Sequence, residues 1–187
     1  MDTKKASPSQ PAIKWALINL ITSVVITYAF QFLNVDQTSS LKYLNYLPFI
    51  IFLLLTQKEY KQQLSGYLTY GEGFLSGFLY SIYTGILVAI FTYLYFTILS
   101  PEMVDKLMAI SRQQMEAKGN LSQDQIDTGM GIATKYFAVI ATVSVVFMYA
   151  IFGAIVSLIS AAVFKNERSA FDIPDDYEAP KSSDPTV

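Results

Sequence analysis

Charged residues divide the chain into long apolar stretches joined by polar connections. Four stretches contain no Asp, Glu, Lys or Arg: Trp15–Val35, Tyr43–Gln57, Gly73–Pro101 and Tyr136–Phe164. An α-helix rises about 1.5 Å per residue and the bilayer core is about 30 Å thick, so roughly 20 apolar residues cross it. The second stretch reaches that length only if Lys42 extends its charged end to the interface and lets Gln37–Leu41 join the helix.

This pattern predicts an all-α membrane protein, a four-helix transmembrane bundle that forms one domain at 12–166. We expect spans at about 13–34, 41–57, 71–99 and 134–164, with a helical extracytoplasmic loop at 100–133 between the third and fourth spans. Pro48 predicts a bend in the second span, or its conversion to a re-entrant segment. We expect disorder in the polar lead 1–11 and in the acidic tail 167–187.

The loop between the third and fourth spans predicts two helices. Ser100-Pro101-Glu102 is typical of a helix start, and the apolar residues after it recur on one helical face: Met103, Val104, Leu107, Met108 and Met115. Ser122 and Gln125 form a capping box that opens a second helix running into the fourth span. The apolar face favours a structural lid over the bundle end or the membrane surface, with a ligand-binding lid as the alternative.

Basic residues predict the orientation in the membrane. If both termini lie on one side, that side carries eight of the Lys and Arg residues and the other side five. Lys and Arg are enriched in cytoplasmic loops, whereas acidic residues contribute little to orientation. We therefore expect a multi-pass protein with both termini in the cytoplasm.

Composition excludes several chemistries. The chain is 52% hydrophobic and 15% charged, against about 25% charged in soluble domains. It contains no Cys and no His, which removes disulfides, thiolate nucleophiles, the commonest general base and Cys or His metal sites. A net charge of -2 gives no basic face for nucleic acid. We therefore expect no enzyme, no cofactor, no metal site and no nucleic-acid partner.

Small residues recur at every fourth position in the third span: Gly73, Gly77, Ser81, Gly85 and Ala89. The fourth span offers a similar ridge: Gly153, Ser157 and Ala161. Small side chains let two helices approach closely in lipid, where association depends on such packing. The pattern favours packing of the third span on the fourth, with homodimerisation through the same ridge as the alternative.

Polar residues recur with the same spacing in the first span: Asn19, Ser23, Thr27 and Gln31. Interhelical hydrogen bonds are the favoured interpretation, and a polar path for a solute is the alternative. Glu72 lies at the start of the third span, where the helix dipole favours an acid. An ion-coupling carboxylate at Glu72 is the alternative interpretation.

One segment carries a family resemblance. Ser65–Phe74 (SGYLTYGEGF), followed by Gly77 and Phe78, resembles the signature that leads into the third span of a bacterial four-span membrane family, domain of unknown function 4199. The resemblance extends over Ala12–Asn166, through Leu99-Ser100-Pro101 to a small-residue fourth span that closes on Lys165. It implies an integral protein of the bacterial inner membrane and supplies no catalytic residues, because the family has no assigned activity.

Three functions are consistent with these residues. The leading hypothesis is a non-enzymatic structural or accessory component of a membrane complex, whose partners are the lipid bilayer and either a second copy or another membrane protein. A small transporter or channel with a polar path along the first span, gated near Glu72, is the alternative. The third is a lipid-modifying enzyme that uses acids of the outer loop: Glu102, Asp105, Asp124 and Asp127.

Overall fold

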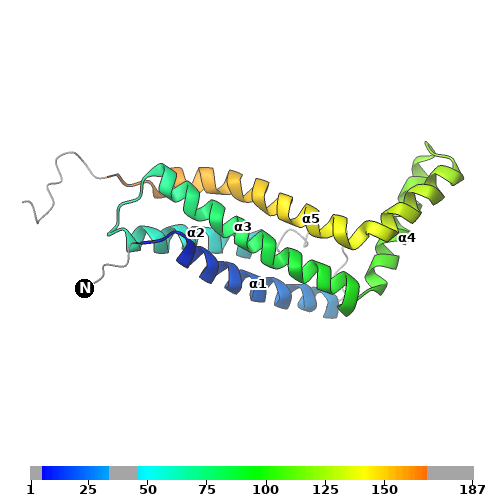
Figure 1. The fold of residues 1–187 in the computed structure, drawn as a ribbon, viewed down its shortest axis with the longest axis horizontal. Coiled ribbons are helices and arrows are strands. Elements are labelled where there is room, and N and C mark those ends of the chain that lie inside the picture. Colours follow the sequence, from blue (N-terminus) through cyan, green and yellow to red (C-terminus); the bar gives the residue numbers. More distant parts are fainter. Residues whose placement is uncertain (1–5, 34–45, 168–187) are drawn as a thin grey trace, which may run out of the picture.

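The computed structural model describes residues 6–33 and 46–167, and within these residues the fold is all-helical, as predicted. The helices are α1 (Ser9–Phe32), α2 (Tyr46–Gln63), α3 (Tyr70–Leu94), the π-helix η2 (Tyr95–Leu99), α4 (Glu102–Lys118) and α5 (Gln123–Phe164). α1, α2, α3 and α5 pack together, and α4 forms a hairpin with the start of α5 (Figure 1). α1 and α3 run in the same direction, and α5 returns alongside α3 (Figure 1).

Three segments are long and apolar enough to cross a membrane: Ser9–Phe30, Tyr70–Leu99 and Gln123–Phe164. They correspond to the first, third and fourth predicted spans, so the structure supports a membrane protein. The described part of α2 does not join them, because its 18 residues end in a polar turn with Lys58, Glu59 and Lys61. Residues 41–45, where the second span was expected to begin, lie outside the described residues.

Two prolines lie in first helical turns. α1 begins at Ser9, inside the expected lead 1–11, and contains Pro11 near its start. Pro48 lies in the first turn of the described α2. A first turn has no intrahelical acceptor for its backbone N–H groups, so proline costs little there. The residues before Tyr46 lie outside the described part, so the bend or re-entrant segment predicted from Pro48 stays a prediction.

α2 supplies the apolar centre of the bundle. Phe49 is 1% exposed, and its ring centroid lies 5.3 Å from that of Tyr80 in α3 and 5.1 Å from that of Tyr149 in α5. The small side chains of Ala12 and Ala16 in α1 are fully buried in the same cluster. Their size lets α1 approach α2 closely, so three long helices share one core through α2.

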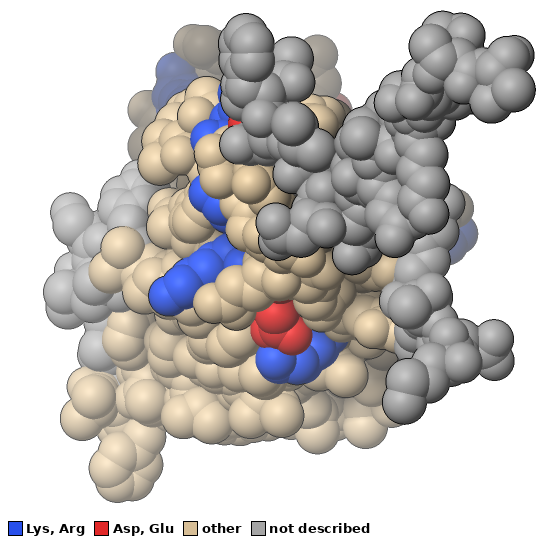
Figure 2. All heavy atoms as spheres, turned by 90° about the vertical axis from the view of Figure 1, so that its left-hand side faces the viewer, with Lys and Arg blue, Asp and Glu red and all other residues tan. Residues whose placement is uncertain are grey.

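One end of the bundle is polar (Figure 2). Glu59 accepts hydrogen bonds from Lys14 Nζ at 2.6 Å and from Trp15 Nε1 at 2.7 Å, which joins α2 to α1. Lys61 Nζ donates to the carbonyl of Phe164 at 3.0 Å and so meets the end of α5. These cations and the indole are typical of a membrane–water interface.

The opposite end carries the α4–α5 hairpin. α4 ends at Gly119, whose φ of 64° is the left-handed conformation that glycine adopts readily, and α5 opens with the predicted capping box. At about 1.5 Å per residue, the 42-residue α5 is roughly twice as long as a bilayer core is thick. The hairpin therefore projects beyond the bundle end (Figure 1). α4 has no fully buried residue, and four residues of its predicted apolar face are half-buried: Met103, Val104, Leu107 and Met108. The lid over the bundle end or the membrane surface stays a prediction.

Candidate functional site: an uncharged pocket beyond the first turn of α2

The small residues of α3 and α5 meet along one seam. A Cβ atom built on Gly73 would lie 3.2 Å from the Cβ of Ala161, and one on Gly77 would overlap Ser157 Oγ. Farther along, a Cβ on Gly153 would overlap the side chain of Ser81. The structure thus brings together residues of both predicted ridges. Backbone approach this close is available only to very small side chains.

The seam continues toward the middle of the bundle. A Cβ on Gly85 would lie 3.1 Å from the Cβ of Tyr149, and Ala89, the last residue of the predicted ridge, is 4% exposed. A large aromatic residue of α5 here takes the place of a small one. The α3–α5 contact is therefore close from Gly73 to Gly85, and it is intramolecular.

Gln57 of α2 completes the seam, a role that the sequence analysis missed. The side chain is fully buried, and its Nε2 donates to the carbonyl of Gly73 at 3.0 Å. Ser157 lies within 3.5 Å of the same nitrogen, and its hydroxyl donates to the carbonyl of Phe74 at 2.9 Å. Three helices are thus joined by side chains that bond to backbone carbonyls, which holds their relative positions.

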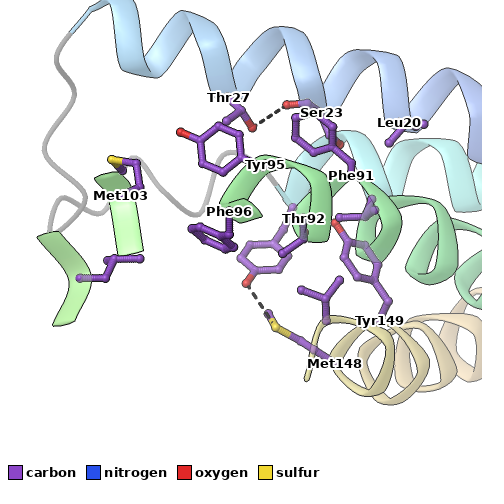
Figure 3. Close-up of a pocket in the computed structure, with 14 residues that line it drawn as sticks. Leu20, Ser23, Thr27, Phe91, Thr92, Tyr95, Phe96, Met103, Met148 and Tyr149 are labelled. Atoms are coloured by element: carbon purple, nitrogen blue, oxygen red, sulfur yellow. Dashed lines mark hydrogen bonds between the residues drawn. The ribbon is translucent and has the colours of Figure 1, made fainter. Parts of the chain in front are cut away.

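A pocket of about 470 Å³ lies nearer the hairpin end, between α1, α3, η2, α4 and α5 (Figure 3). Its floor includes Tyr46, the first residue of α2, whose hydroxyl donates to Met148 Sδ at 3.9 Å. Tyr46 is also the first described residue after 34–45, and the other described lining residues belong to α1, α3, η2, α4 and α5. Met103 and Leu107, from the first turns of α4, border it on the outer side.

The π-helix shapes one wall of the pocket. Its widened turn is closed by the N–H of Ser100, which donates to the carbonyl of Tyr95 at 2.8 Å. Tyr95 and Phe96 both line the pocket although they are consecutive in the chain. A π-turn changes the direction in which neighbouring side chains leave the helix, and such turns are frequent at functional sites.

The pocket is lined by aromatic, aliphatic and thioether side chains. Five lining residues are aromatic: Tyr46, Phe91, Tyr95, Phe96 and Tyr149. Ser23, Thr27 and Thr92 contribute hydroxyl groups, and none of the described lining residues is charged. Thr27 donates its hydroxyl to the carbonyl of Ser23 at 2.8 Å, within α1 itself. The described lining suits an uncharged, mainly apolar molecule.

A family model described as "Protein of unknown function (DUF4199)" matches residues 14–166. The chain belongs to this family. No curated protein and no solved structure matches the chain. The DUF4199 match begins at Lys14, which bonds Glu59, and ends at Asn166, which pairs with Leu68 through backbone hydrogen bonds of 2.8 Å in both directions.

The polar residues of α1 in this DUF4199 chain do not share one environment. Asn19 is fully buried, and neither of its amide atoms has a hydrogen-bond partner among the described residues. Ser23 and Thr27 line the pocket, and the side chain of Gln31 lies outside the described part. The interhelical hydrogen bonds expected of this ridge are therefore wrong for Asn19 and Thr27, because Thr27 bonds within its own helix.

Glu72 belongs to the cap of α3. Its carboxylate accepts from the backbone N–H of Thr69 at 3.0 Å and from the Thr69 hydroxyl at 2.8 Å, and the Glu72 N–H donates back to that hydroxyl. Glu72 and Val88 are separated by about 24 Å of helix at 1.5 Å per residue. The structure therefore does not bring Glu72 to the pocket that Ser23 and Thr27 line.

This cap gives a direct test of Glu72. We expect Glu72→Gln to lower the free energy of unfolding by less than about 1 kcal/mol, because the amide oxygen still accepts from Thr69. Thr69→Ala is expected to cost about 1 kcal/mol through loss of the capping hydroxyl. Thermal unfolding in detergent measures both. A much larger effect of Glu72→Gln than of Thr69→Ala would show that the charge has a role beyond the cap.

Proposed function

We propose that this DUF4199 protein is a non-enzymatic accessory component of a membrane complex. In this proposal it spans the inner membrane four times, with both termini in the cytoplasm, and the α4–α5 hairpin projects on the other side toward a partner protein. The close packing of α3 on α5 supports a structural role. The observation that carries the proposal is the exposed apolar surface of the hairpin.

The parallel course of α1 and α3 supports four spans. Because both helices point the same way (Figure 1), the chain between them must return across the same thickness. The apolar residues of α2 form part of this returning segment. The cations Lys14 and Lys61, at the end of the bundle opposite the hairpin, fit a cytoplasmic interface.

The hairpin supports a partner on the other side. α4 buries none of its residues, and large apolar side chains of the hairpin are exposed: Ile110 is 47% exposed, Met115 36% and Leu121 47%. Apolar side chains gathered outside the spanning segments are typical of interaction surfaces. Arg112 pairs with Glu116 in α4 and with Asp127 in α5, which fixes the hairpin as a unit. These acids raise the pKa of the Arg112 guanidinium further above its ordinary value.

Single cysteines test the proposal directly, because the natural chain has none. Ile110→Cys and Ala109→Cys place thiols on neighbouring exposed positions of α4, roughly 100° apart around the helix. Each variant is treated in intact cells with a membrane-impermeant thiol reagent that carries a short photo-crosslinker. Ser182→Cys in the tail serves as the cytoplasmic control.

We expect both α4 cysteines to be labelled in intact cells, and Ser182→Cys only after permeabilisation. Illumination should then give an adduct of one defined mass from Ile110→Cys, and at least about tenfold less from Ala109→Cys, because the partner buries the apolar face. Labelling of Ser182→Cys in intact cells would contradict the orientation. Equal adducts from both α4 positions, or adducts with lipid alone, would contradict the partner surface.

A further inference from the structure

We infer that the pocket beyond Tyr46 holds one acyl chain of a bilayer phospholipid, from the leaflet nearer the hairpin. This goes beyond the proposed accessory role, which concerns the outer surface of the hairpin. The chain would lie between α1, η2 and α5 (Figure 3).

The position of the pocket gives the first argument. α1, α3 with η2, and α5 continue past the level of Tyr46 as membrane-length helices, and the pocket lies between them. A cavity at this depth opens to hydrocarbon rather than to water, so lipid is the solvent that fills it.

The chemistry of the walls gives the second argument. None of the described lining residues is charged, so the walls offer no counter-charge to an ion, a phosphate or a sugar phosphate. The hydroxyl of Thr27 is already bonded to the carbonyl of Ser23. Met103 and Met148 add flexible thioethers that adapt to an irregular apolar chain. The buried part of the occupant is therefore hydrocarbon.

Size and length give the third argument. The volume of about 470 Å³ falls within the roughly 300–1,000 Å³ of small-molecule sites. The lining on α3 and η2 runs from Val88 to Phe96, which is about 12 Å of helix. One leaflet contributes about 15 Å of hydrocarbon. Glu102, Asp105 and Lys106 follow at the outer rim in α4, where a lipid headgroup meets charges of both signs.

Filling the pocket tests the inference. In the full chain, Leu20→Trp with Val88→Trp adds two indoles at lining positions. The matched control, Ile21→Trp with Ile98→Trp, adds two indoles at positions that are 65% and 68% exposed and outside the pocket. Native mass spectrometry in a mild detergent then measures phospholipid retained per protein. We expect about one retained phospholipid in the natural chain and the control, and roughly tenfold less in the filled variant, since losing a few buried methylenes accounts for that factor.

Photolabelling keeps the inference testable if the filled variant does not fold. The natural chain is reconstituted into phosphatidylcholine vesicles whose acyl chains carry a diazirine near their ends, and labelled peptides are mapped after illumination. We expect adducts on Leu20, Met103 and Met148 in addition to those on lipid-facing positions such as Val163, which is 78% exposed. Adducts on exposed positions alone would overturn the inference. Equal phospholipid retention by the filled variant and the natural chain would also overturn it. Retention of a quinone, or crosslinking of residues 34–45 into the pocket, would also overturn it by giving another occupant.

Discussion

Gly77→Ala is expected to destabilise the protein by about 2 kcal/mol, the range typical of overpacking. The new Cβ would overlap Ser157 Oγ and would lie 2.8 Å from Gln57 Nε2 and 3.2 Å from Leu53 Cδ2. Relief requires Ser157 Oγ and Gln57 Nε2 to shift, or α3 to move away from α5. Either change disturbs the bonds from Ser157 to the carbonyl of Phe74 and from Gln57 to the carbonyl of Gly73. Gly77→Ile should be worse and should abolish the monodisperse species. Thermal unfolding in detergent, followed by the fluorescence of Trp15, measures the loss; Trp15 is the single tryptophan of the chain.

Two variants control this result. Gly71→Ala makes the same change in the first turn of the same helix, where an added Cβ meets nothing within 4 Å. We expect it to be neutral or stabilising by up to about 1 kcal/mol, because alanine has the higher helix propensity. Combining Gly77→Ala with Ser157→Gly removes the hydroxyl that the new methyl meets, so the two effects should be less than additive. Equal losses of stability from Gly71→Ala and Gly77→Ala would contradict close packing of α3 on α5 at Gly77.

The long helices and their pairing were accessible from the sequence. Membrane spans depend on length and on the absence of charge, and both are local properties of the chain. The every-fourth-residue spacing of Gly73, Gly77 and Ser81 identified the face of α3, and Gly153 with Ser157 identified the face of α5. Membrane helices pack through such faces, so the local pattern carried the tertiary contact.

α2 and the pocket were less accessible. Gln57 stands beside Lys58 and Glu59, so in the sequence it marks the end of a span, whereas in the structure it is buried against the carbonyl of Gly73. Its partners are 16 and 100 residues away, a separation that no local pattern encodes. The pocket combines side chains of five α-helices with a π-turn at Tyr95, which has no periodic signature. Only the four-residue spacing of Ser23 and Thr27 in the sequence indicated residues that line the pocket.

Gln57→Glu is expected to be among the most damaging single changes, with a loss of about 3 kcal/mol or more in the free energy of unfolding. The substitution replaces Nε2, which donates to the carbonyl of Gly73, by an oxygen that faces that carbonyl. It also places a negative charge at a fully buried position, where the described neighbours within hydrogen-bond distance are a carbonyl and a hydroxyl group. The charge therefore loses its hydration and gains no cation.

Matched variants separate charge from packing at this position. Gln62→Glu makes the same change on the exposed side of α2, and we expect it to alter stability by less than about 0.5 kcal/mol. Gln57→Leu keeps most of the volume and removes both polar atoms of the side-chain amide, of which Oε1 has no hydrogen-bond partner among the described residues, so it should cost only about 1 kcal/mol. Thermal unfolding followed through Trp15, which stacks on Phe52 of α2 at 5.5 Å, measures all three. If Gln57→Leu proves as harmful as Gln57→Glu, the hydrogen bond to Gly73 rather than the buried charge accounts for the loss, and the seam depends on that bond.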